Sequence, residues 1–177
     1  FFDSNAARII DGDSGKVLGA VHVAPMSSIV FAPDGKHIYV AETIWTKGNR
    51  GTRQDMVTVY DARTLKLETE IPLSGRLPTG YRHALFAIST DGKIGYVYNM
   101  SPASSVIVVD LVKHEVLSEV EIAGCAMVFA TSKKSVGTIC GDGTFSTIEL
   151  SKISAPVITQ TPVFFAPDDD PIFDNAI

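Results

Sequence analysis

The chain has little of what membrane proteins, nucleotide-binding enzymes and nucleic-acid-binding proteins require. Its 177 residues contain no run of ~18 apolar residues that could form a transmembrane helix. They contain no Gly-x-Ser-x-Gly, Walker-type or Gly-x-Gly-x-x-Gly motif. The formal net charge of −5 argues against a nucleic-acid partner, because such proteins normally present a clustered basic face. We therefore expect neither membrane insertion nor nucleic-acid binding.

Candidate catalytic and metal-binding residues are also few. The four histidines, His22, His37, His83 and His114, show no ligand or triad spacing, so we expect them to be strand or turn residues. His83 is the one of interest, because it precedes an expected innermost strand. The acidic run 168–170 lacks the alternating ligand spacing of an EF-hand loop, so a solvated loop is favoured over a calcium site. We expect no metal site.

What the chain does contain is a repeated pair of hairpins. Short alternating runs rich in Val, Ile and Tyr, separated by tight turns, predict half-buried antiparallel strands. The unit is clearest over residues 55–100, and it recurs upstream and downstream. Asp11, Asp61 and Asp110 occupy equivalent turn positions. A repeat of ~40–50 residues with four strands is typical of a β-propeller blade, and no segment shows a sustained helical period.

The repeat predicts an all-β fold, a β-propeller of which about three and a half blades are present. We treat residues 1–177 as one partial propeller domain. The chain has no initiator Met and no signal peptide, and both ends look cut, so we expect a fragment of a longer chain. The expected strands are 6–12, 16–23, 27–33, 37–44, 55–61, 66–72, 83–89, 94–100, 105–111, 115–122, 125–131, 135–140, 144–150 and 157–164.

The two cysteines flank one of these hairpins. If Cys125 and Cys140 are partners, the index sum of 265 puts the centre of the turn between Ser132 and Lys133, inside a polar stretch. Non-hydrogen-bonded antiparallel partners have Cα atoms ~4.5 Å apart, within reach of a disulfide. A disulfide would indicate an oxidising compartment. Two buried free thiols are the alternative.

A basic loop stands out in this acidic chain. Residues 45–54 carry Lys47, Arg50 and Arg53 beside the single tryptophan, Trp45. Arg and Trp are enriched at interaction hot spots. We therefore predict Trp45, Arg50 and Arg53 as subunit-contact residues, with an ordinary solvated loop as the alternative. By themselves, the residues indicate half of an exported propeller without a set of catalytic residues. These properties are expected of a scaffold or partner subunit.

Several stretches resemble the heavy subunit of the quinoprotein amine dehydrogenases. They are ARIIDGDSGKVLG, RGTRQDMVTVYDARTL from Arg50 to Leu65, NMSPASSVIVVDL from Asn99 to Leu111, the cysteine hairpin ending TICGDG, and DDPIF. The resemblance extends nearly end to end, in the same order and with the same spacing. TICGDG and DDPIF look closer to the aralkylamine branch than to the methylamine branch.

The resemblance implies a seven-bladed propeller about twice this length, in a periplasmic heterotetramer of two heavy and two light subunits. The cofactor, tryptophan tryptophylquinone, and the catalytic base would lie on the light subunit, so this chain is expected to carry neither. The enzyme would oxidise a primary amine to an aldehyde and ammonia. Electrons would pass to a blue copper protein similar to azurin or amicyanin.

The same resemblance implies two sets of site residues. A family Phe that lines the substrate channel matches Phe1, with Phe2 beside it, and the family's intra-subunit disulfide matches Cys125 and Cys140 in spacing. Two other functions remain open at this point. One is a stand-alone propeller of the surface-repeat or lactonase-like kind that binds a ligand or partner at its channel mouth. The other is a structural or adhesion propeller.

Overall fold

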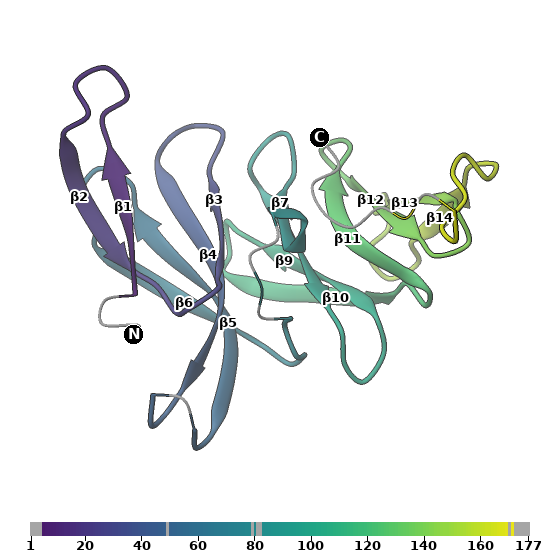
Figure 1. Ribbon diagram of the computed structural model, residues 1–177, viewed down its shortest axis with the longest axis horizontal. Helices are drawn as coiled ribbons and strands as arrows, with labels where there is room; N and C mark the ends of the chain where they lie inside the picture. The colour runs from purple at the N-terminus through teal and green to yellow at the C-terminus, as the bar shows by residue number, and fades with distance from the viewer. Residues whose placement is uncertain (1–4, 49, 79, 81–82, 170, 172–177) are drawn as a thin grey trace.

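The computed structural model describes residues 5–48, 50–78, 80, 83–169 and 171. This part of the chain is all-β apart from the 3₁₀ turn η1 (His83–Leu85). It forms one two-stranded and three four-stranded antiparallel sheets, which stand side by side in chain order (Figure 1). The strands are β1 (Ala6–Ile10), β2 (Val17–His22), β3 (Ser28–Phe31), β4 (His37–Trp45), β5 (Arg53–Asp61), β6 (Leu67–Leu73), β7 (Phe86–Ile88), β8 (Ile94–Asn99), β9 (Ser105–Asp110), β10 (Glu115–Glu121), β11 (Cys125–Ala130), β12 (Ser135–Cys140), β13 (Phe145–Glu149) and β14 (Val157–Gln160).

Each four-stranded sheet pairs its strands in chain order, and contacts between sheets join β3 to β7 and β7 to β11. These features are those of consecutive propeller blades, and they confirm the predicted fold class. Because successive antiparallel strands reverse direction, their connections alternate between two edges of the sheets. The turn edge carries the β3–β4, β7–β8 and β11–β12 turns. The loop edge carries the β4–β5, β8–β9 and β12–β13 turns and the connections between sheets. In Figure 1 the β3–β4 and β7–β8 turns lie at the top and the β4–β5 turn at the bottom.

The repeated aspartates have the same structural role in three hairpins. The Oδ1 atoms of Asp11, Asp61 and Asp110 accept a hydrogen bond from the backbone amide three residues further on, at 2.6, 2.5 and 2.8 Å. At Asp11 and Asp61 a hydroxyl three residues on donates to the same oxygen and is the main cause that lowers the pKa of each carboxyl. These aspartates therefore close turns.

The same three turns share an unusual backbone position. The residue four positions after each aspartate has positive φ: 67° at Gly15, 57° at Leu65 and 60° at His114. His114 is therefore a turn residue, as expected. Only glycine adopts this left-handed region without steric cost. The turn geometry is consequently maintained even where the sequence supplies a side chain that opposes it.

The core consists of three apolar clusters, each between neighbouring sheets. Side chains alternate along the central strands, so that Val106 and Val108 of β9 face one cluster while Ile107 and Val109 face the other. Strands buried on both faces are what stacked blades require. The cluster between the second and third sheets is made of Ala32, Tyr39, Ala41, Val57, Val59, Ile71, Leu73, Leu77, Phe86, Val97, Ile107, Val109 and Leu111.

Several element boundaries differ from the sequence-based expectations. The β4–β5 hairpin continues to Trp45 and Arg53, so part of the expected loop is strand. Residues 83–85 form η1 and leave only a short β7. The last strand ends at Gln160, so it stops short of the predicted end at 164. In each case the difference lies at an element boundary, where local pattern is weakest.

The predicted disulfide is present, and it joins Cys125 to Cys140. These residues are direct partners in the β11–β12 ladder, with Cα atoms 3.8 Å apart. The constant index sum holds only at this end of the hairpin. Met127, with φ of 67°, lies in an irregularity that shifts the register by one residue before Phe129 pairs with Gly137. The turn is therefore displaced by half a residue from its predicted centre.

Candidate subunit-docking edge

The β4–β5 hairpin extends the loop edge and presents its basic tip to solvent. Backbone hydrogen bonds close the tip, from the Thr46 amide to the Thr52 carbonyl (3.1 Å) and from the Lys47 amide to the Arg50 carbonyl (3.0 Å). The side chains of Lys47 and Arg50 are exposed. Among the described residues, neither ammonium nor guanidinium group forms an ion pair. The tip therefore offers two positive charges on a closed, hydrogen-bonded turn.

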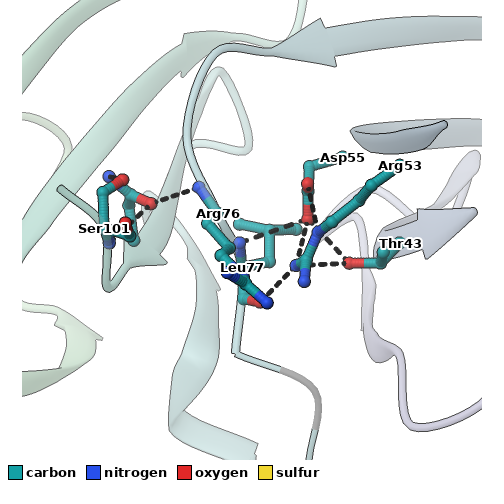
Figure 2. A network of polar contacts seen from close by, with 7 residues as sticks. Thr43, Arg53, Asp55, Arg76, Leu77 and Ser101 are labelled. Carbon is teal, nitrogen blue, oxygen red and sulfur yellow. Dashed lines mark hydrogen bonds and ion pairs between the residues drawn. The ribbon is translucent and has the colours of Figure 1, made fainter.

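Arg53, also predicted as a contact residue, points into the molecule. Its Nε and Nη2 bind the two oxygens of Asp55 at 2.7 Å each, in the bidentate geometry that arginine favours (Figure 2). Nη2 also donates to the Leu77 carbonyl at 2.6 Å and to Thr43 Oγ1 at 3.0 Å. The Trp45 ring centroid lies 6.0 Å from the guanidinium. Trp45 and Arg53 are thus brought together as a cross-strand pair.

Asp55 is the acceptor at the centre of this network. Besides Arg53, Thr43 Oγ1 donates to it at 2.7 Å and the Leu77 amide at 3.2 Å. Burial acts to raise the pKa of the carboxyl, but the hydrogen bonds from these three donors and the charge of Arg53 outweigh it. The pKa is therefore lowered overall. Asp55 remains ionised at neutral pH and holds the connection that follows β6.

The same connection is held from the other side by Asn99 of β8. Its Oδ1 accepts a hydrogen bond from the Arg76 amide at 2.6 Å, while its Nδ2 donates to Ser105 Oγ and Glu119 Oε1 at 2.8 Å. Gly75 has no side chain at the point of closest approach, where a Cβ would collide with the Asn99 amide. Residues 74–77 are consequently fixed to two neighbouring sheets.

A buried carboxylate, Glu42, also lies at this edge, and the sequence interpretation did not identify it. It is 4% exposed. It accepts hydrogen bonds from the Ala24 amide at 2.6 Å and from the Thr58 hydroxyl. Burial raises its pKa, these hydrogen bonds act against the rise, and Glu70 adds to it. The sequence feature that could have identified Glu42 is a charged residue inside the otherwise apolar run of β4.

Glu42 borders a cavity with a volume of about 480 Å³, which is within the size range of small-molecule sites. Its wall includes Trp45, Tyr60 and Glu70, so it opens beside the basic hairpin. Tyr60 donates a hydrogen bond to the His22 carbonyl and thereby joins the first sheet to the second. The loop edge therefore combines a projecting tip, a braced connection and a cavity.

The other predicted positions are placed as follows. Phe1 and Phe2, the expected channel residues, lie outside the described residues. The backbone of His83 forms the start of η1, directly before the innermost strand β7. Asp168 and Asp169 are exposed. In the described ranges, no group of three His, Cys, Asp or Glu side chains could hold a metal ion. No described helix is long and apolar enough to cross a membrane.

Solved structures share the fold at low sequence identity. A dihydro-heme d1 dehydrogenase NirN in complex with DHE matches with a TM-score of 0.63 at 20% identity, covering 88% of this chain and 32% of that chain. The WD40 repeats of RRP9 match with a TM-score of 0.57 at 15% identity, covering 88% of this chain and 44% of that chain. At these identities the likeness concerns the fold alone, and it agrees with stacked blades.

Sequence comparisons identify the family. The methylamine dehydrogenase heavy chain of Methylobacillus flagellatus is 28% identical over 171 residues, which is 96% of this chain and 43% of that protein. The heavy chain of Paracoccus versutus is 29% identical over 163 residues, 91% of this chain and 38% of that protein. The chain thus spans less than half the length of these relatives. A family model described as methylamine dehydrogenase heavy chain matches residues 1–177, and the chain therefore belongs to the methylamine dehydrogenase heavy chain family.

Proposed function

We propose that this chain is part of the heavy subunit of a periplasmic amine dehydrogenase. The match of the family model over residues 1–177 carries the proposal. In this role the chain is a scaffold: it binds a light subunit, on which a primary amine is oxidised to an aldehyde and ammonia. The assembly would contain two heavy and two light subunits, and a blue copper protein of the azurin or amicyanin kind would accept the electrons. The choice between methylamine and an aralkylamine as the amine rests on the sequence resemblance alone.

The cofactor belongs on the light subunit in this proposal. Tryptophan tryptophylquinone is built from two tryptophan side chains, and this chain has one, Trp45. The indole of Trp45 already packs beside the Arg53 guanidinium. These residues do not fit the cofactor, so no chemical step is assigned to this chain.

The loop edge is the surface that we assign to the light subunit. Lys47 and Arg50 supply positive charge at the tip, whereas Arg53 and Asp55 brace the hairpin from within. Phe1 and Phe2 would shape the apolar channel to the quinone. Such a wall discriminates amines that differ by one methylene by ~1–3 kcal/mol.

Coexpression tests the proposal. The full-length heavy chain, produced in the periplasm together with a light subunit, should yield a complex with visible-range quinone absorbance. Native mass spectrometry should give two copies of each chain, and reduction with alkylation should reveal the disulfide by its mass shift. Purification of the full-length chain without partner and without quinone absorbance would refute the proposal.

A further inference from the structure

A second cavity lies at the turn edge, between the β7–β10 sheet and the β11–β14 sheet. Its volume is about 570 Å³, in the range of small-molecule sites. All four strands of both sheets are described, so both walls are complete blades. We call this cavity the interblade pocket. It is lined by Asp91, Lys93, Ile94, Val108, Leu117, Ser118, Lys133, Lys134, Leu150, Ser151, Ile153 and Ser154.

The floor of the interblade pocket is apolar. Val108 and Leu150 belong to the buried cluster between these two sheets, and Ile94 and Leu117 pack against that cluster while remaining partly exposed. Ser118 interrupts this floor, and its Oγ is buried without a hydrogen-bond partner among the described residues. A buried hydroxyl without a partner is destabilising unless something else supplies one.

The rim of the pocket is basic. Lys93, Lys133 and Lys134 are exposed, and within the described chain none of their ammonium groups lies within ion-pair distance of a carboxylate. Among the described lining residues, Asp91 alone is acidic. A hydrogen bond from Ser89 is the main cause that lowers the pKa of its carboxyl, and Lys93 and Lys133 contribute. The rim therefore carries three positive charges and one negative charge.

The rim is also held in place by one backbone contact between the two sheets and one within the β11–β14 sheet. The Thr90 amide donates to the Ser132 carbonyl at 3.4 Å, which joins the β7–β8 turn to the β11–β12 turn. The Leu150 amide donates to the Lys134 carbonyl at 2.8 Å. The charged side chains thus project from turns that are fixed relative to the apolar floor.

We propose that the interblade pocket binds a small amphipathic carboxylate. Its apolar body would cover Ile94, Leu117 and Leu150, and its carboxylate would accept hydrogen bonds from the rim lysines. The apolar floor favours such a ligand over inorganic phosphate, which would leave the floor exposed to water. The excess positive charge favours it over a neutral alcohol of the same length.

The location makes this site independent of the proposed light-subunit contact. The pocket opens at the turn edge, whereas the basic hairpin tip and the braced connection lie at the loop edge. Both edges can therefore be occupied at once. A ligand in the pocket would bridge two blades by filling the gap between them. It would stabilise the folded state by an amount that grows with the logarithm of the ratio of ligand concentration to Kd.

Photo-crosslinking with the full-length protein tests the site directly. A diazirine-bearing decanoate should label peptides that contain 91–94, 117–118, 133–134 or 150–154, and excess decanoate should prevent the labelling. Labelling confined to other peptides would overturn the proposal. Because crosslinking does not depend on amine oxidation, the result is separate from the test of the proposed function.

Affinity measurements on matched variants give the second test. The double variant Lys133→Gln/Lys134→Gln should weaken decanoate binding by about tenfold or more, since it removes charge-assisted hydrogen bonds. Lys113→Gln is the control, because Lys113 lies on the β9–β10 turn at the same edge but outside the lining. Equal losses in the double variant and the control, or phosphate or decanol binding as tightly as decanoate, would refute the proposal.

Discussion

At the scale of single residues, left-handed turn positions are occupied by side chains that are unfavourable in this backbone conformation. Gly15, Leu65 and His114 have nearly the same φ, although only the first is a glycine. Leu65 is compensated, because its side chain packs against the cluster between the first two sheets and fills the space above Gly19. His114 is exposed and has no comparable packing.

The exposed position should therefore tolerate glycine better than histidine. We predict that His114→Gly raises the free energy of unfolding of the full-length chain by up to about 1 kcal/mol, because the left-handed strain is removed. Leu65→Gly, the matched control, should lower it, since apolar packing is lost. Chemical denaturation of both variants measures the two signs, and a destabilised His114→Gly protein would contradict the strain argument.

Asp55 gives a pH-dependent prediction. Its pKa in the folded chain is lowered, so its ionised form stabilises the fold at neutral pH, and this stabilisation is lost as pH falls through the folded pKa. Asp55→Asn should destabilise the chain at pH 7. The difference in the free energy of unfolding between this variant and the wild-type chain should shrink as pH falls below about 4, where aspartate in unfolded chains becomes protonated. Thermal unfolding of both chains across pH 3–7 measures this difference in stability. A difference that stays constant with pH would rule out ionisation of Asp55 as the cause.

At the scale of elements, the disulfide hairpin carries the clearest stability prediction. The Cys125–Cys140 bond closes a loop with a sequence separation of 15. Replacing both cysteines with serine should lower the free energy of unfolding by about 3 kcal/mol in the chain-entropy model. Reduction of the wild-type chain should produce a similar loss and should leave the serine variant unchanged. A large effect of reductant on the variant would show that some other group responds.

Most of these elements could be predicted from the sequence, because alternation and turn residues act locally. The three aspartate turns and the cysteine pairing are examples. The register shift at Met127 could not be predicted, since it depends on how β11 packs rather than on its own composition. The sequence likewise predicts Arg53 as a contact residue at the surface, because its partners Thr43 and Leu77 are remote in sequence and come together only in the fold.

At the scale of the whole molecule, the two edges should respond differently to charge changes. We predict that Lys47→Glu/Arg50→Glu weakens association with the light subunit, with the largest effect on the association rate at low ionic strength. Lys113→Glu at the turn edge changes the net charge in the same direction and should have little effect. Binding kinetics measured with the purified light subunit immobilised on a surface would compare the two variants. Equal effects would mean that net charge, rather than location, governs association.

The braced connection between the second and third sheets has a further consequence for assembly. Residues 74–77 are hydrogen-bonded to Asp55 on one blade and to Asn99 on the next, so neither the connection nor the angle between the blades needs to be ordered when a partner arrives. Ordering of loops and side chains is a major entropic cost of association. In the proposed complex, the surface assigned to the light subunit would already have its bound shape, so part of that cost would be met when the chain itself folds.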